Sequence, residues 1–157
     1  MSFDILISLL VELPKTAILR RYTFANGDVY EGPWSSDNKM QGRGVMRHFN
    51  KDVYEGEFEA GQKKGPGGVL KYHNGSVYEG EFAGNMKSGQ GVLKYSNGDC
   101  YTGHWLNDEM DGAGLFKYSN GDCYSGTYKS DKRHGGWADN LFTFLMLYLV
   151  ESPAMQN

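Results

Sequence analysis

The chain has 157 residues and a formal net charge of -3, so it lacks the basic excess that nucleic-acid-binding proteins typically carry. Glycine accounts for 22 residues, about twice the usual share of ~7 %, whereas proline accounts for only 4. With 14 % aromatic residues, this composition excludes a collagen, a disordered linker and a helical bundle. It favours a β protein with many tight turns.

The glycines divide the chain into three parts, because all of them lie between Gly27 and Gly136. We therefore predict an apolar N-terminal arm over residues 1–21, a repeat region over 22–136 and an apolar C-terminal tail over 137–157, with both flanking segments able to form short helices. The N-terminal arm has no basic region and no small-residue cleavage site, so we expect no signal peptide. The longest apolar run, residues 141–150, is too short for a membrane-spanning helix of about 20 residues.

A short motif recurs five times in the repeat region. Each copy is a tyrosine followed by x-Gly-x and an aromatic residue, and the copies begin at Tyr30, Tyr54, Tyr78, Tyr101 and Tyr124. A pair of glycines follows about eleven residues after each tyrosine. Asn-Gly steps occur at 26–27, 74–75, 97–98 and 120–121. A constant period of about 23 residues predicts a repeat architecture, with the last copy incomplete.

The alternation within each copy predicts a β-hairpin. Tyr78, Gly80 and Phe82 share one face of a strand, whereas Glu79 and Glu81 share the other. The Asn-Gly steps predict type I′ turns, because both central residues of that turn need positive φ. The sequence thus predicts an all-β, elongated, single-layer antiparallel meander of about five hairpins. One face carries aromatic residues, and the glycines let the rings lie over the backbone.

The repeat resembles the MORN motif (membrane occupation and recognition nexus), and five copies cover most of the chain. The resemblance implies a twisted meander of hairpins with an aromatic groove. It also implies a non-catalytic cytoplasmic scaffold that binds proteins or membranes, often at cytoskeletal or ciliary structures.

Three positions depart from the repeat pattern. Pro33 removes a hydrogen-bond donor from the first Tyr-x-Gly-x-Trp strand, so we expect that strand to lie near an edge or to pair poorly on one side. The half-repeat before it, residues 22–27, is expected to pair loosely. In the second repeat Asn50-Lys51 replaces Asn-Gly, which weakens that turn.

No catalytic or metal site is evident in the sequence. Cys100 and Cys123 are one repeat apart, about 9.5 Å in a sheet and too far for a disulfide, so we predict free thiols, as in a reducing compartment. The four histidines occupy four different repeat positions without metal-ligand spacing. We therefore expect no enzyme, no metal and no cofactor.

We expect the aromatic face to bind a protein partner, most simply an apolar helix, because an open sheet cannot leave so much ring surface in water. The alternative is that the same residues only hold the sheet together. The candidate residues are Tyr54, Phe58, Tyr78, Phe82, Tyr101, Trp105 and Tyr124, with Leu70, Tyr72, Leu93, Tyr95, Phe116 and Tyr118 beside them.

Other readings of this face stay open. The two apolar flanking segments or a second copy in a homodimer would also cover it. An anionic lipid or phosphoinositide surface is a further candidate partner, although basic residues do not outnumber acidic ones in the repeat region. The candidate lipid contacts are Lys63, Lys64, Lys132 and Arg133.

Overall fold

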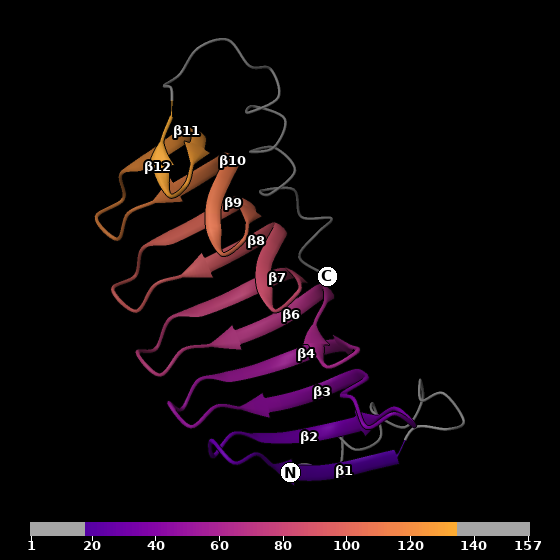
Figure 1. Ribbon diagram of the computed structural model, residues 1–157. Helices are drawn as coiled ribbons and strands as arrows, with labels where there is room; N and C mark the ends of the chain where they lie inside the picture. The colour runs from indigo at the N-terminus through magenta and orange to yellow at the C-terminus, as the bar shows by residue number, and fades with distance from the viewer. Residues whose placement is uncertain (1–17, 135–157) are drawn as a thin grey trace, which may run out of the picture.

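The computed structural model describes residues 18–134, and over this range the chain forms one open antiparallel sheet of 12 strands without a helix (Figure 1). The strands are β1 (Ile18–Thr23), β2 (Val29–Trp34), β3 (Gly42–Arg47), β4 (Val53–Glu59), β5 (Gln62–Lys63), β6 (Gly65–Lys71), β7 (Val77–Ala83), β8 (Met86–Lys94), β9 (Cys100–Leu106), β10 (Glu109–Lys117), β11 (Cys123–Lys129) and β12 (Lys132–Arg133). Neighbours in the chain are neighbours in the sheet, and the short β5 pairs with β4 beside β6. The predicted meander is confirmed.

The register places like residues in rows across the strands. Each of the first four repeat tyrosines faces an apolar or aromatic residue on both sides, so that Tyr78 pairs with Leu70 and Leu93. The glycines two residues further on also form a row, in which Gly91 lies between Gly80 and Gly103. Because alternate residues point to opposite faces, the tyrosine and glycine rows share one side of the sheet. We call this side the aromatic face and the opposite side the outer face.

The rings on the aromatic face pack edge to face along the whole array. Tyr78 contacts Phe82 of its own repeat and Trp105 of the next, with ring centroids 5.3 Å apart in both pairs. The same contact joins each repeat to its successor in the pairs Tyr30–Phe58, Tyr54–Phe82 and Tyr101–Tyr128. Such pairs contribute about 0.5–1.5 kcal/mol each beyond the burial of their area, so this row joins the repeats into one core.

The glycine row is required by the close approach of the tyrosine rings. The Tyr101 hydroxyl donates a hydrogen bond to the carbonyl oxygen of His104 at 3.1 Å, which draws the ring along its own strand. A Cβ atom at Gly103 would lie 2.5 Å from the Tyr101 hydroxyl oxygen, and one at Gly114 would lie 2.4 Å from it. Any side chain at these positions would therefore displace the ring, as the sequence pattern predicted.

The Asn-Gly steps do not form the predicted type I′ turns. In the first turn the amide of Gly27 donates to the carbonyl of Phe24, and the amide of Phe24 donates to the carbonyl of Asp28. Only Gly27 has positive φ, which describes a type I turn followed by a left-handed residue. The asparagine serves another purpose, because Asn26 Oδ1 accepts the amide of Asp28 at 3.0 Å. Lys51 takes the glycine position of the second turn with φ of 74°, whereas the glycines at this position in the other turns have φ between 86° and 95°.

Type I′ turns occur at the opposite ends of the hairpins, where the sequence offers no Asn-Gly. Both residues between the paired strands have positive φ there, at 60–61, 84–85, 107–108 and 130–131. Ala60 and Ser130 adopt this conformation without being glycine or asparagine. The other six positions are glycine, asparagine or aspartate, which favour positive φ, so strand geometry sets the conformation only at Ala60 and Ser130.

The array begins earlier than predicted. Residues 18–21, assigned to the N-terminal arm, belong to β1, which pairs with β2 along its whole length. The expectation of a helix is therefore wrong for residues 18–21. The expectation of loose pairing over residues 22–27 is wrong for the two of them that belong to β1. Pro33 lies in β2 opposite Leu19, and the ladder between β2 and β3 ends at Glu31, which confirms the poor pairing expected on one side.

Residues 1–17 and 135–157 lie outside the described part of the chain, so what was predicted for these flanking segments stays a prediction. Within residues 18–134 no helix is long and apolar enough to span a membrane.

Candidate binding site on the aromatic face

The candidate site is built from the part of the aromatic face that the core does not use. Six of the predicted residues are almost completely buried against one another: Tyr54, Phe58, Tyr78, Phe82, Tyr101 and Trp105. Leu93 is buried with them. These residues offer little surface to a partner, and their burial favours the alternative that they hold the sheet together.

The remaining predicted residues are half-buried and border the core: Leu70, Tyr72, Tyr95, Phe116, Tyr118 and Tyr124. Tyr72, Tyr95 and Tyr118 stand at equivalent positions just before successive Asn-Gly turns. Phe116 packs between two of them, with ring centroids 5.8 Å from Tyr95 and 4.7 Å from Tyr118. Burial raises the pKa of Tyr72 to about 12, with nearby acidic groups adding to the effect, so its hydroxyl is neutral at pH 7. These rings form an apolar stripe along the array.

A row of cations lies along the other side of the face. From the second repeat on, the residue nine positions after the repeat tyrosine is paired with the aromatic residue that ends the motif, and it is Lys63, Lys87, Met110 and Arg133 in successive repeats. Lys63 Nζ lies 5.0 Å from the Tyr54 ring centroid, and Lys87 Nζ lies 4.2 Å from that of Trp105. The Arg133 guanidinium lies 4.3 Å from the Tyr124 ring. We call Lys63, Lys87 and Arg133 the cation row.

Hydrogen bonds between repeats fix the backbone that carries the cation row. The Lys63 amide donates to Asn85 Oδ1 at 2.9 Å, and the Lys87 amide donates to Asp108 Oδ1 at 2.8 Å. In both cases the acceptor belongs to the type I′ turn of the next repeat. The backbone of each lysine is therefore held in place by the next repeat and does not belong to a free loop.

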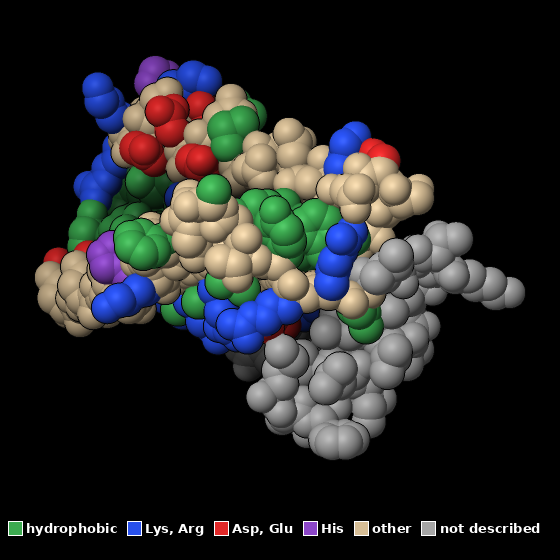
Figure 2. All heavy atoms as spheres, turned by 60° about the horizontal axis from the view of Figure 1, so that its bottom comes forward, with side chains coloured by type: hydrophobic (Ala, Val, Ile, Leu, Met, Phe, Trp, Pro, Cys, Tyr) green, Lys and Arg blue, Asp and Glu red, His purple; other side chains and the backbone are tan. Residues whose placement is uncertain are grey.

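The two lysines of the row are partly removed from water. Burial lowers the pKa of Lys63, although Asp108, Asp52 and Asp28 oppose the shift from a distance. Burial likewise lowers the pKa of Lys87, against the opposing effect of Asp108 and Asp131. Space-filling atoms seen from the β1 end show hydrophobic side chains gathered in hollows of the surface with Lys and Arg side chains beside them (Figure 2).

The four predicted lipid contacts do not form one basic patch. Lys63 and Arg133 turn onto aromatic rings, whereas their neighbour Lys64 pairs with Glu59. Lys132 is exposed on β12, three repeats away from Lys63 on β5. Lys132 and Arg133 are adjacent residues of β12, so they point to opposite faces of the sheet.

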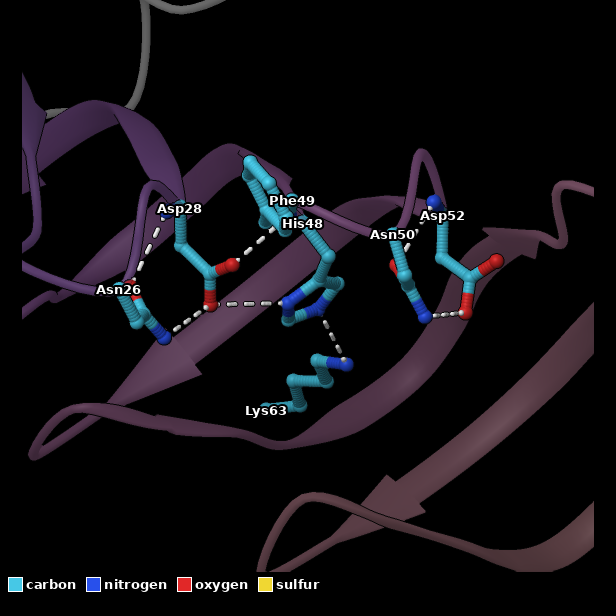
Figure 3. A network of polar contacts seen from close by, with 7 residues as sticks. All are labelled: Asn26, Asp28, His48, Phe49, Asn50, Asp52 and Lys63. Carbon is cyan, nitrogen blue, oxygen red and sulfur yellow. Dashed lines mark hydrogen bonds and ion pairs between the residues drawn. The ribbon is translucent and has the colours of Figure 1, made fainter.

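A polar network joins the first turns to the cation row (Figure 3). Asp28 Oδ2 lies 3.1 Å from His48 Nδ1, and His48 Nε2 lies 3.3 Å from Lys63 Nζ. With Lys63 charged, Nε2 is the acceptor, so His48 is the neutral tautomer that donates from Nδ1 to Asp28. Burial raises the pKa of Asp28, but hydrogen bonds from the Phe49 amide, His48 and Asn26 outweigh it and leave the pKa below its ordinary value.

The turn carboxylates connect each repeat to the next, which sequence reasoning missed. Asp28 Oδ1 accepts the amide of Phe49, Asp52 Oδ1 accepts that of His73, and Asp99 Oδ1 accepts that of Ser119. In the third repeat Ser76 Oγ accepts the amide of Ser96. The signal was present in the sequence as an Asp or Ser two residues after each asparagine, but local turn chemistry already accounted for it.

Cys100 and Cys123 both lie opposite Lys117, on the strands at either side of it, and are free thiols. Among residues 18–134 no group of three His, Cys, Asp or Glu side chains is placed to hold a metal ion.

The comparison with protein families agrees with the repeat seen in the structure. The family model for the MORN repeat matches five consecutive segments, residues 30–53, 54–77, 78–100, 101–123 and 124–135. No curated protein sequence matches the chain. The matched segments coincide with the hairpins from β2 to β12 and cover more than half of the chain, which therefore belongs to the MORN-repeat proteins.

Proposed function

We propose that the chain is a non-catalytic scaffold that binds a helical segment of a protein partner along its aromatic face. The observation that carries the proposal is the stripe of half-buried rings, Tyr72, Tyr95, Phe116 and Tyr118, which continues over successive repeats. MORN repeats are generally found in proteins that bind other proteins or membranes, which supports the class of function. Aromatic anchors are where binding energy concentrates in such interfaces.

The proposal moves the binding residues away from the core rings named from the sequence. Tyr54 and Tyr101 have no exposed surface, so a partner would first have to displace the sheet's own packing. The half-buried stripe and Leu70 bury additional apolar area without that displacement. A cytoplasmic place of action at a cytoskeletal or ciliary structure is part of the proposal and is supported by the resemblance alone.

Selection of helical peptides from a displayed random library tests the proposal. We expect the selected peptides to bind the full chain and to lose affinity at least tenfold when Tyr95 and Tyr118 are both changed to Ser. A matched control changes Val69 and Val92 to Ser, which lie on the outer face of the same sheet. Both variants are first checked for cooperative thermal unfolding.

Two results would contradict the proposal. If the selected peptides bind the Tyr95→Ser/Tyr118→Ser variant as well as the wild type, the stripe is not the site. If no peptide is selected but vesicles containing phosphatidylserine bind in a salt-sensitive way, the chain is a peripheral membrane module instead.

A further inference from the structure

We propose that the segment bound on the aromatic face is an acidic amphipathic helix whose carboxylates meet Lys63, Lys87 and Arg133. This inference rests on the proposed function and specifies the chemistry of its partner. Its basis is the contrast between the two faces of the sheet in how basic residues are paired.

Basic residues on the outer face either have carboxylate partners within the array or, like Arg47 and Lys71, are exposed to solvent. Arg43 lies 3.3 Å from Glu55, Lys94 lies 3.7 Å from Glu79, and further pairs join Arg21 to Glu31 and Lys129 to Asp111. Opposite charges across strands stabilise a sheet by about 0.2–1 kcal/mol each, and this pattern is what an exposed face would be expected to show.

The cation row breaks this pattern. Within residues 18–134 no carboxylate lies at ion-pair distance from Lys63, Lys87 or Arg133, and each contacts an aromatic ring instead. The polar contact of the Lys63 ammonium is the neutral Nε2 of His48. Two half-buried ammonium groups thus lie over core rings of the aromatic face with hydrogen-bond donors still free, and an incoming carboxylate would supply the missing charge.

Because the two lysines are half-buried, a peptide is favoured over a membrane as the binding partner. Lys63 and Lys87 fold down onto Tyr54 and Trp105, so their ammonium groups lie beside the rings rather than at the end of extended side chains. A flat bilayer surface would meet the exposed hairpin ends first. A helix seated in the aromatic face can contact its rings and these ammonium groups together, and at Arg133 the cation row meets the stripe, because the guanidinium lies 5.7 Å from the Tyr118 ring.

The repeat spacing matches one helical interval. Equivalent residues of adjacent repeats are two strand spacings apart, about 9.5 Å, and residues i and i+7 of an α-helix are about 10.5 Å apart on nearly the same face. Lys63 and Lys87 are in adjacent repeats, so they fit acidic residues seven apart. The next position along the row is Met110, which fits an apolar residue one further heptad on, and Arg133 follows it. The bound helix is therefore expected to carry, at successive intervals of seven residues, two acidic residues, an apolar residue and a third acidic residue.

The same peptide library provides the first test. Peptides selected on the full chain are expected to carry Asp or Glu at i and i+7, and selection on a Lys63→Gln/Lys87→Gln variant is expected to lose that pair while retaining apolar residues. A matched control is the Lys64→Gln/Lys94→Gln variant, which removes the same charge from side chains already paired with Glu59 and Glu79. This control is expected to select the same peptides as the wild type.

Binding of one synthetic peptide then measures the effect directly. Calorimetry is expected to show at least tenfold weaker binding when the two acidic residues are replaced by glutamine, which is the size of one charge-assisted hydrogen bond. The Lys63→Gln/Lys87→Gln variant is expected to bind both peptides equally weakly. Lys87→Arg, which keeps the charge, should retain the preference.

The outcomes separate this inference from the function on which it rests. Selected peptides without acidic residues that still depend on Tyr95 and Tyr118 would overturn the acidic helix and leave the scaffold in place. Vesicle binding that depends on Lys63 and Lys87, or a concentration-dependent dimer that the peptide does not dissociate, would overturn it in favour of a lipid or a second copy. Failure to select any peptide would overturn both.

Discussion

At the scale of single residues, the fold depends on where a side chain is absent. In the first four repeats the tyrosine ring occupies the space that side chains at two glycines would fill, and its hydroxyl donates a hydrogen bond to the carbonyl three residues on. The sequence pattern predicted this close approach because a glycine in a strand is otherwise unfavourable. It did not predict the hydrogen bond, since the acceptor is a backbone carbonyl that any residue provides.

The substitution Gly103→Ala is expected to lower the free energy of unfolding by about 2–3 kcal/mol, because the methyl group overlaps the Tyr101 hydroxyl and the backbone of Gly114. Urea denaturation measures the change. Gly61→Ala is the control, because a Cβ there meets no atom within 4 Å and only the left-handed backbone opposes it. Equal losses in the two variants would show that the ring does not require the glycine.

Lys51 holds a left-handed conformation with φ of 74° at the position that Gly27 and Gly75 occupy in other turns. We expect Lys51→Gly to raise the free energy of unfolding by about 1 kcal/mol, because the strain of a Cβ in this conformation is removed. Lys51→Ala loses the same side chain but keeps the strain, so it should leave stability nearly unchanged. Thermal unfolding of the three proteins compares them, and a gain in the alanine variant would assign the effect to the lysine side chain.

At the scale of the elements, the turns do more than reverse the chain. The turns at the Asn-Gly positions present a carboxylate or hydroxyl to the next repeat, and the type I′ turns present Asn85, Asp108 and Asp131 to the preceding one. Strand identity and register could be predicted from the period of two and the repeat. The turn types could not, because the Asn-Gly step here forms a type I turn followed by a left-handed residue, and two of the type I′ turns include Ala60 and Ser130, which do not favour positive φ.

The turn carboxylates make the stability of the array depend on pH in the acidic range. Burial raises the pKa of Asp52, but hydrogen bonds from His73 and Asn50 outweigh it and hold the pKa below its ordinary value. A lowered pKa means that the stabilisation is present above the unfolded value of about 3.9 and is lost as the pH falls through the folded value. We expect the urea midpoint of the wild type to fall between about pH 4 and pH 2, and to fall less in Asp52→Asn. Parallel curves for the two proteins would exclude this carboxylate as a source of acid sensitivity.

At the scale of the whole molecule, the sequence predicted the sheet and its aromatic face but not which part of that face is available. Periodicity identifies the residues that share a side of a sheet. It does not show that Tyr78 and Trp105 cover each other, because that contact joins different repeats. The cation row was not recognised as a row. Lys63 and Arg133 were named only as candidate lipid contacts, and Lys87 was not named although it stands at the same distance from its repeat tyrosine, because a lysine on a strand is usually a solvated residue.

The row of core tyrosines predicts resistance to alkali followed by cooperative unfolding. Burial raises the pKa of Tyr30, Tyr54, Tyr78 and Tyr101 well above 10, and that of Tyr128 to about 12. A raised pKa means that the stabilisation is complete below the unfolded value of about 10 and is lost as the pH rises above it. Absorbance at the tyrosinate band and circular dichroism are expected to change together. Ionisation of all tyrosines near pH 10 with the sheet intact would contradict the burial.

The pairing of every strand with its neighbours in the chain has a consequence for biosynthesis. Because the hydrogen-bonded partners of a hairpin are separated by few residues, loop closure is fast and no hairpin waits for a distant segment. A growing chain can therefore add one finished repeat at a time as it leaves the ribosome, each docking its ring against the one before. Folding that proceeds from the first repeat to the last leaves only the newest edge of the sheet exposed to aggregation at any moment.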